Sequence, residues 1–475
     1  MNKINNILNS LNSNDVKYCV WKGPSKLESV KVGLEDLDIL LDRKNFDLTV
    51  MLIKNAGFTQ VTNIKEKLDY GTFDFICLDT QSRWLHIHLH LYIIFGNSIV
   101  RNYYLPLDAE ILSNRVFNER NNCWNINPSH DIALSLIRYL VRRRPLYGYV
   151  DMSNDFMLLK DIYKDYNIDV GILKSKIFTP NLLAMMNKFN TLSLDEVYSN
   201  RKAIKKSIVF YKMPVNIKYF LNYIFVLFIL SWRKVMHRKG SKVLSNRGLV
   251  IAFVGIDGSG KSSAIERLSN ALAKQLIVTT ISVGSGVSGS SWYRKLAFKI
   301  FGTKAKFKGH AKIRKHNINS KPISYPWYYN LWLFLCLFDK KRELKRGLQA
   351  ANKGHVVLSD RWLQSEQQGF IDSPRFNGRI PTSWLSKKLC NYESAIFNIT
   401  QQNIPDIIVR FDVSPENSVL RKPNDLNYEQ ASFAGEKLKT LVWSGAKVVS
   451  IDANKKIEDV DKQLVLLINN ELKSN

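Results

Sequence analysis

One run of eight residues combines the residue types that grip phosphate: Gly255-Ile256-Asp257-Gly258-Ser259-Gly260-Lys261-Ser262. It fits Gly-x-x-x-x-Gly-Lys-Ser/Thr, with an apolar strand predicted at 249–254 and an amphipathic helix at 261–274. Glycines permit a tight loop whose backbone N–H groups point at phosphate oxygens, and the start of the helix adds a positive dipole end. The run therefore predicts an ATP site made of Gly255, Gly258, Ser259, Gly260, Lys261, Ser262 and Ser263.

Three side chains of this loop have separate predicted roles. Lys261 is placed to reach the β- and γ-phosphates, and the Ser262 hydroxyl to ligate Mg²⁺. A carboxylate inside the loop is not needed to hold phosphate and would repel it. Asp257 is therefore predicted to face an acceptor, as a hydroxyl orienter or a ligand of Mg²⁺-bound water. The alternative is an aspartate that only stabilises the turn.

A second predicted strand, 355–359, ends in Asp360 and Arg361. Ligands of open α/β sheets bind at the carboxyl ends of the strands, which is where these two side chains would lie. Asp360 is predicted to serve Mg²⁺, and Arg361 to grip an oxyanion of the acceptor in a bidentate manner. An ordinary salt bridge at the strand end is the alternative. Arg421 follows a third strand, either as a lid cation for ATP phosphates or as part of a solvated basic face.

Three motifs together, at 255–262, 360–362 and 405–416, resemble the thymidylate kinase family of P-loop kinases over roughly residues 248–472. The resemblance implies that Lys261 and Ser262 bind ATP and magnesium, that Asp257 and Arg361 face the acceptor, and that Arg421 belongs to the lid. The sequence departs from the family after the second motif. Trp362 stands where the family commonly has Tyr, and residues 366–369 read Glu-Gln-Gln-Gly instead of Ala-Tyr-Gln. The segment that recognises the base is therefore altered.

The N-terminal half has the outline of a different site. A Gly-x-Ser turn at 23–25 precedes Asp36-Leu37-Asp38, and alternate strand residues share a face, so Asp36 and Asp38 could hold Mg²⁺ together. This outline resembles the nucleotidyltransferase superfamily over roughly residues 15–110. The resemblance implies a third carboxylate on an adjacent strand, for which Asp74 is a substitute candidate.

The strand where that carboxylate is expected carries three histidines instead, at alternate positions: His86, His88 and His90. The row could bind a transition metal, or it could be simple alternation on a half-exposed strand. The N-terminal domain is accordingly either an active nucleotidyltransferase or a degenerate domain that binds nucleotide or substrate.

The net charge indicates anionic partners. The chain has 69 Lys and Arg against 41 Asp and Glu, a formal charge of +28. Residues 267–338 contain no acid, and their basic residues crowd between Lys304 and Lys315. Either this is a solvated loop, or it recognises a polyanionic acceptor or lipid head group. No nucleic-acid recognition motif appears, so nucleic acid is not expected as a partner, whereas a homodimer remains open.

A 14-residue apolar run at 219–232 is short of the ~20 residues needed to cross a membrane. We expect a helix in a core or domain interface, with membrane-surface contact and a true span as alternatives. The N-terminus has no apolar signal region, and the five cysteines are dispersed. Both features predict free thiols in a cytoplasmic protein, with peripheral contact at the inner membrane face as an option.

The predicted organisation is a nucleotidyltransferase-like α+β domain at 1–115, a helical region at 116–235, a basic linker at 236–248 and a P-loop domain at 249–475. Strand and helix alternate in the last domain, which predicts an α/β fold with a parallel sheet and helices on both faces.

The leading functional hypothesis is a kinase that transfers the γ-phosphoryl group of ATP to a small acceptor. The acceptor is a nucleoside monophosphate such as dTMP, or a sugar or lipid-linked anionic compound of surface-polysaccharide metabolism. Two alternatives stay open: nucleotidyl transfer through Asp36 and Asp38, and a non-enzymatic ATP-switched binding protein.

Overall fold

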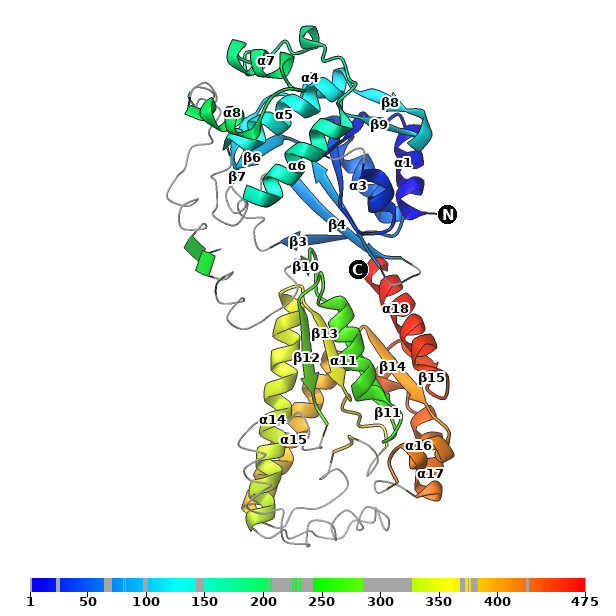
Figure 1. The fold of residues 1–475 in the computed structure, drawn as a ribbon. Coiled ribbons are helices and arrows are strands. Elements are labelled where there is room, and N and C mark those ends of the chain that lie inside the picture. The colour runs from blue at the N-terminus through cyan, green and yellow to red at the C-terminus, as the bar shows by residue number, and fades with distance from the viewer. Residues whose placement is uncertain are drawn as a thin grey trace. The chain divides into compact units, whose positions relative to one another are not determined.

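The computed structural model divides into two compact units, Met1–Arg238 and Lys239–Asn475, each described by itself (Figure 1). The described residues are 2–22, 26–63, 71–79, 81, 83–96, 101–141, 149–202, 206, 224–225, 227–228, 231, 242–284, 327–367, 372–374, 376, 383–423 and 427–474. Both units combine helices with a sheet that contains parallel strand pairs, so the fold is mixed α/β.

The N-terminal unit is built on a mixed sheet. Its β2 pairs with β5 in parallel, and β5 pairs with β4 antiparallel. In spatial order the strands are β3 (Thr59–Asn63), β4 (Thr72–Leu78), β5 (Trp84–His90), β2 (Leu37–Leu41), β1 (Tyr18–Lys22), β9 (Cys123–Asn125) and β8 (Val116–Asn118).

Helices cover both faces of this sheet. Alternate residues of β1 belong to different cores: Val20 packs with Ile4 and Ile7 of α1, whereas Trp21 packs with Ile137 of α5. The two faces are therefore both apolar over much of their area. The helices are α1 (Lys3–Ser13), α2 (Leu27–Lys31), α3 (Phe46–Asn55), α4 (Asp108–Ser113), α5 (Pro128–Val141), α6 (Tyr149–Ile162), α7 (Pro180–Asn187) and α8 (Leu194–Ser199).

Some strands of this unit lie where the sequence predicted none. Residues 116–125, assigned above to the helical region, form β8 and β9, and β9 joins the sheet by pairing with β1 in parallel. A separate hairpin is made by β6 (Ile93–Gly96) and β7 (Arg101–Leu105). β8 and β9 each have three residues, and β8 is mostly exposed. Neither of these two strands therefore shows the long apolar run or the alternation from which a strand is predicted.

The sheet of the C-terminal unit is wholly parallel, as predicted. Its strands lie in the order β12 (Val278–Ser282), β13 (Val356–Asp360), β11 (Val250–Gly255), β14 (Ile407–Asp412) and β15 (Val448–Asp452). The chain continues from β11 to the strands on one side of it and later crosses to those on the other. The carboxyl end of β11 is therefore the switch point at which open α/β sheets bind ligands.

The helices of the C-terminal unit form two groups that cover the two faces of the sheet (Figure 1). On one face α14 (Trp327–Asn352) packs against α15 (Trp384–Gln402), and on the other α11 (Lys261–Leu272) packs against α18 (Ile457–Ser474). Two further helices, α16 (Pro415–Arg421) and α17 (Tyr428–Lys439), follow β14 and contact each other.

Part of the predicted linker is structured. Lys242–Leu244 form β10, whose backbone bonds with Gln275, Ile277 and Gly354 of the C-terminal unit. The boundary between the two units falls inside the predicted linker, between Arg238 and Lys239. The described part of the linker thus packs as an extension of the C-terminal unit.

Two segments named in the sequence analysis are largely outside the described residues. Of the apolar run at 219–232, the structure describes 224–225, 227–228 and 231, where Ile224 is 48% exposed and Phe228 65%. The basic cluster from Lys304 to Lys315 lies wholly outside them. Among the helices that the structure describes, none is long and apolar enough to span a membrane. All five cysteines are free thiols, as predicted.

Candidate functional site

The glycine-rich loop joins β11 to α11, the element order that its sequence predicts. Gly258 and Gly260 have φ angles of +84° and +85°, in the left-handed region that favours glycine. A Cβ on Gly258 would lie 2.5 Å from the carbonyl oxygen of Ser418, so this position also has no room for a side chain. Ser418 donates a hydrogen bond to the Asp257 carbonyl at 2.7 Å, which seats α16 on the loop.

Lys261 is held inside the curve of this loop. Its Nζ donates to the carbonyls of Gly255 and Ile256, both at 2.9 Å, and to Ser259 Oγ at 3.2 Å. The side chain is buried, and burial together with the charge of Arg361 lowers the pKa of Lys261 to about 8. The two carbonyl oxygens thus hold the Lys261 ammonium inside the loop, where it would contact an anion bound there.

Ser262 and Asp360 meet at the carboxyl edge of the sheet. The Ser262 hydroxyl donates to Asp360 Oδ2 at 3.2 Å, across 98 residues of sequence. The other carboxylate oxygen, Oδ1, is buried and makes no hydrogen bond in the described part of the chain. A hydroxyl and a carboxylate with an unsatisfied oxygen form a donor set of the kind that Mg²⁺ prefers, so these residues fit the predicted metal.

Arg361 is held between two carboxylates. Its Nη2 donates to Asp257 Oδ1 at 2.6 Å, and its Nη1 lies 3.4 Å from Asp372 Oδ2. Burial acts to lower the pKa of Arg361, but the charges of Asp372, Asp257 and Asp360 outweigh it and raise the pKa. The two residues predicted to face the acceptor, Asp257 and Arg361, therefore contact each other.

The backbone of Arg361 is strained. Its φ is +73°, a conformation that costs a non-glycine residue about 1–2 kcal/mol. The conformation is fixed on both sides, because the Arg361 N–H donates to Phe253 O at 2.9 Å and its carbonyl accepts from Ser359 Oγ at 2.7 Å. Strain that the surroundings hold in place is typical of functional positions.

Asp372 is the residue of this site that the sequence analysis missed. It is buried, has a φ of +56°, and faces Arg361 from a segment eleven residues further along the chain. No motif marks it. The sequence marks it only as an acidic residue in the segment just after Asp-Arg-Trp. Local sequence patterns cannot distinguish such a residue from an ordinary carboxylate in a loop.

The remaining predicted residues lie around the loop. Ser263 is an exposed residue in the first turn of α11. Arg421, the predicted lid residue, ends α16 and donates from Nη2 to the Ala453 carbonyl at 3.0 Å. Beside the loop, a cleft of ≈ 590 Å³ is lined by Ile256, by residues at the carboxyl ends of β14 and β15 and just beyond them, and by α17.

The N-terminal candidates occupy a separate place in the chain. Asp38 lies in β2 and accepts from Lys22 Nζ at 2.8 Å, with His90 Nε2 at 2.7 Å. Asp36 precedes that strand and lies against His86 and His88. Each aspartate thus has its own histidine partners, and the Gly-x-Ser residues 23–25 lie outside the described part of the chain.

Comparisons with known proteins concern less than half of the chain. It is 24% identical over 233 residues to the uncharacterized ATP-binding protein YghS of Escherichia coli K12, which is 47% of this chain and 94% of that protein. The uncharacterized ATP-binding protein YghR of the same strain is 26% identical over 217 residues, 45% of this chain and 84% of that protein.

A thymidylate kinase of Mycoplasmoides gallisepticum is 26% identical over 180 residues, which cover 37% of this chain and 68% of that enzyme. No family model matches the chain. The similarity is distant, and it is to proteins named for ATP binding or thymidylate phosphorylation. None of these comparisons bears on the nucleotidyltransferase resemblance, which stays a prediction.

Proposed function

We propose that this protein is an ATP-dependent phosphotransferase whose C-terminal unit transfers the γ-phosphoryl group of ATP to a small acceptor. The observation that carries the proposal is the convergence of Lys261, Asp360 and Arg361 around the glycine loop, at the switch point of a parallel sheet. The names of the distant relatives, ATP-binding proteins and a thymidylate kinase, support the same reading.

The donor nucleotide is assigned to the loop and to the cleft beside it. The loop amides and Lys261 bind the phosphates, and the cleft beside Ile256 receives the nucleoside, with Arg421 nearby on α16. Ser262 and Asp360 would hold Mg²⁺, which when bound neutralises charge on the β- and γ-phosphate oxygens. Positioning and charge neutralisation are the main contributions that a protein makes to this reaction.

The acceptor is assigned to the side of the loop that carries Asp257 and Arg361. An acceptor oxygen attacks the γ-phosphorus, and the bond from that phosphorus to the β–γ bridging oxygen breaks, which leaves ADP. Arg361 binds an anionic group of the acceptor, and Asp257 orients the attacking oxygen. That oxygen is a phosphate oxygen in a nucleoside monophosphate, or a sugar hydroxyl that releases its proton to solvent as the new P–O bond forms. Because Asp372 and Asp257 already fix the guanidinium, little side-chain entropy is lost when the acceptor binds.

The acceptor classes that suit this arrangement are a nucleoside monophosphate such as dTMP and a sugar or lipid-linked anionic compound. The net charge of +28 favours an anionic acceptor, including one at the cytoplasmic face of a membrane. A cytoplasmic enzyme, with peripheral membrane contact for a lipid-linked acceptor, belongs to the same proposal, as does the option of a homodimer.

The proposal is tested with ATP labelled at the γ-phosphate and a panel of acceptors: dTMP, other nucleoside monophosphates, sugars and lipid extracts. We expect a labelled product with one class of acceptor and none from the Lys261→Met variant. ATP binding without transfer to any acceptor in the panel would contradict the kinase assignment and favour an ATP-switched binding protein.

A further inference from the structure

The strongest unassigned feature is a cluster of histidines and carboxylates in the N-terminal unit. His86, His88 and His90 alternate along β5 and therefore share one face of the sheet. The neighbouring strands set carboxylates beside them, because Asp38 on β2 and Asp74 on β4 both pair with His88 in register. The β-pairing thus brings together groups that are far apart in sequence.

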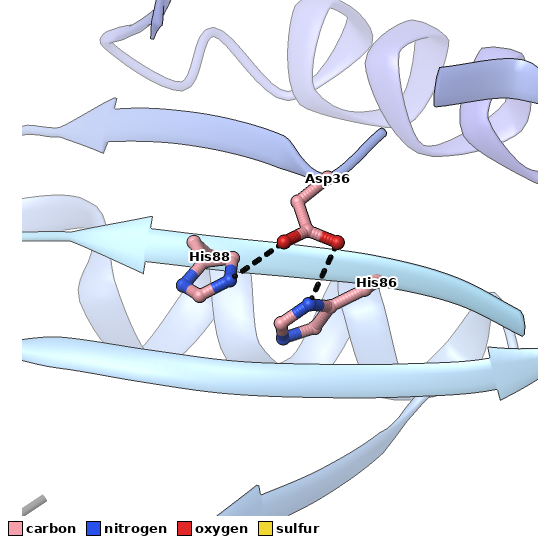
Figure 2. Close-up of side chains that lie close together, drawn as sticks. All are labelled: Asp36, His86 and His88. Carbon is pink, nitrogen blue, oxygen red and sulfur yellow. Dashed lines mark hydrogen bonds and ion pairs between the residues drawn. The ribbon is translucent and has the colours of Figure 1, made fainter. Parts of the chain in front are cut away.

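Within this cluster, one carboxylate faces two imidazoles (Figure 2). Asp36 Oδ1 lies 2.9 Å from His86 Nδ1, and Asp36 Oδ2 lies 3.3 Å from His88 Nε2. One ligand atom from each of the three residues lies within 4.8 Å of the others. The two rings are close to each other, with centroids 4.0 Å apart. This is a set of two imidazoles and one carboxylate that converge on one point.

A second carboxylate lies behind both rings. Asp74 Oδ1 is 3.4 Å from His86 Nε2 and 3.1 Å from His88 Nδ1, the nitrogens that point away from Asp36. His88 Nδ1 is buried and makes no hydrogen bond in the described structure, despite its closeness to that oxygen. A carboxylate on the far nitrogen is the usual outer partner of a metal-ligating histidine, where it fixes the tautomer and raises the basicity of the ring.

Asp38 and His90 form a second group on the same face of the sheet, and the ammonium of Lys22 already lies beside both of them. Asp38 accepts from Lys22 Nζ at 2.8 Å, and that ammonium lies 3.4 Å from His90 Nε2. Since Lys22 supplies the positive charge there, the Asp36 group is the one left for a metal ion.

The cluster borders a cleft whose walls carry both basic and acidic side chains. Asp36 and Asp38 line a hollow of ≈ 240 Å³ together with Lys22, Lys26 and Arg138, and with Glu35 and Asp131. The Nε of Arg138 is buried and makes no hydrogen bond in the described part of the chain. A buried guanidinium nitrogen that makes no hydrogen bond within the described residues, in a hollow that also carries Lys22 and Lys26, can bind an anionic oxygen ligand.

We propose that Asp36, His86 and His88 form a Zn²⁺ site whose remaining coordination position takes a phosphate-class oxygen ligand from this cleft. Three protein ligands that leave one position open are typical of catalytic zinc, and imidazole nitrogens favour zinc over magnesium. The site is separate from the proposed kinase site and goes beyond it. It also replaces the magnesium predicted for Asp36 and Asp38 with a metal that the histidines prefer.

The test is Zn²⁺ binding to the full chain after chelator treatment, measured by competition with a chromophoric chelator. We expect one equivalent in wild type, and a rise in Kd of more than about 100-fold in Asp36→Asn and in His88→Gln. Asp74→Asn is expected to raise Kd by about 10-fold to 100-fold, as loss of an outer carboxylate does.

The matched control is Glu35→Gln, which removes the same charge from the next residue. The Glu35 side chain is 47% exposed and that of Asp36 49%, so both variants should fold. Glu35 pairs with Lys26 and touches no histidine in the described contacts. If Asp36→Asn binds Zn²⁺ as tightly as Glu35→Gln does, the site is wrong. Displacement of Zn²⁺ by millimolar Mg²⁺ would equally overturn it.

The open position is tested with Co²⁺ as a spectroscopic probe in place of Zn²⁺. Inorganic phosphate should change the visible absorption of the Co²⁺ form of the wild-type chain, and Lys26→Ala should raise the phosphate concentration needed. A spectrum that saturating phosphate leaves unchanged would overturn the assigned ligand class.

Discussion

The two sites are built from different parts of the polypeptide. The phosphate loop consists mainly of backbone: two left-handed glycines, a helix start and carbonyls that hold Lys261. The histidine cluster consists of side chains from neighbouring strands, brought together by pairing between β2, β4 and β5. A backbone site leaves a contiguous motif in the sequence, whereas a side-chain site across a sheet leaves only scattered residues.

The largest expected effect is that of replacing Lys261, which lies in the phosphate loop of the C-terminal unit. Lys261→Met should lower γ-phosphoryl transfer about 100-fold to 1,000-fold, because a positioned charge on the phosphates is lost. The measurement is kcat/KM with the best acceptor. Lys274→Met, an exposed lysine just beyond α11, is the control and should keep its activity. Equal losses in both variants would remove the special role of Lys261.

A pH effect is expected in the N-terminal unit. Burial raises the pKa of Asp131 from 3.8 to about 6, opposed by the hydrogen bond from Tyr163 and the charge of Arg138. The folded state therefore binds this proton more tightly than the unfolded state. Protonated Asp131 therefore stabilises the folded state below pH ~4. This contribution, about 3 kcal/mol in total, is lost as pH rises through about 6.

Asp131→Asn removes this titration. Urea unfolding between pH 4 and pH 7 should give a wild-type free energy of unfolding that falls, relative to the variant, by about that amount. Parallel curves for the two proteins would show that Asp131 does not titrate in this range.

A smaller effect separates two glycines of the loop. Gly258→Ala and Gly260→Ala both force alanine into a left-handed conformation, at a cost of about 1–2 kcal/mol. Only Gly258 has a backbone atom in the way, the Ser418 oxygen, whereas nothing lies within 4 Å of a Cβ on Gly260. Thermal unfolding should rank Gly258→Ala as the less stable variant, and the reverse order would contradict the loop geometry.

The smallest effect is expected for Arg361→Lys. Lysine keeps the charge but cannot contact Asp257 and Asp372 with a planar fork, so acceptor KM should rise about tenfold while ATP KM changes little. Steady-state kinetics with each substrate varied measure this difference. A rise confined to ATP KM would move Arg361 to the nucleotide side of the site.

The difference between the phosphate loop and the histidine cluster also explains which features could be predicted from the sequence. The loop, Asp360 at the end of β13 and the parallel sheet follow from local patterns, because apolar runs and glycine spacing determine them. The partner of Arg361 could not be predicted, since Asp372 reaches it through a turn with no motif. Nor could the parallel pairing of β2 with β5 be predicted, although it sets Asp38 opposite His88, because periodicity does not reveal which strands are neighbours.

Element ends were less predictable than element types. Asp36 was expected inside a strand together with Asp38, but that strand begins at Leu37, so Asp36 lies just before it. A residue just outside a strand is less constrained by the ladder, which lets Asp36 reach both histidines.

The most direct test of the account is γ-phosphoryl transfer measured in two variants of the full chain, Lys261→Met and Asp36→Asn. We expect transfer to be lost in Lys261→Met and kept in Asp36→Asn, because the phosphate loop performs the reaction and the histidine cluster is a separate site. Transfer that survives Lys261→Met, or that disappears in a folded Asp36→Asn variant, would contradict it.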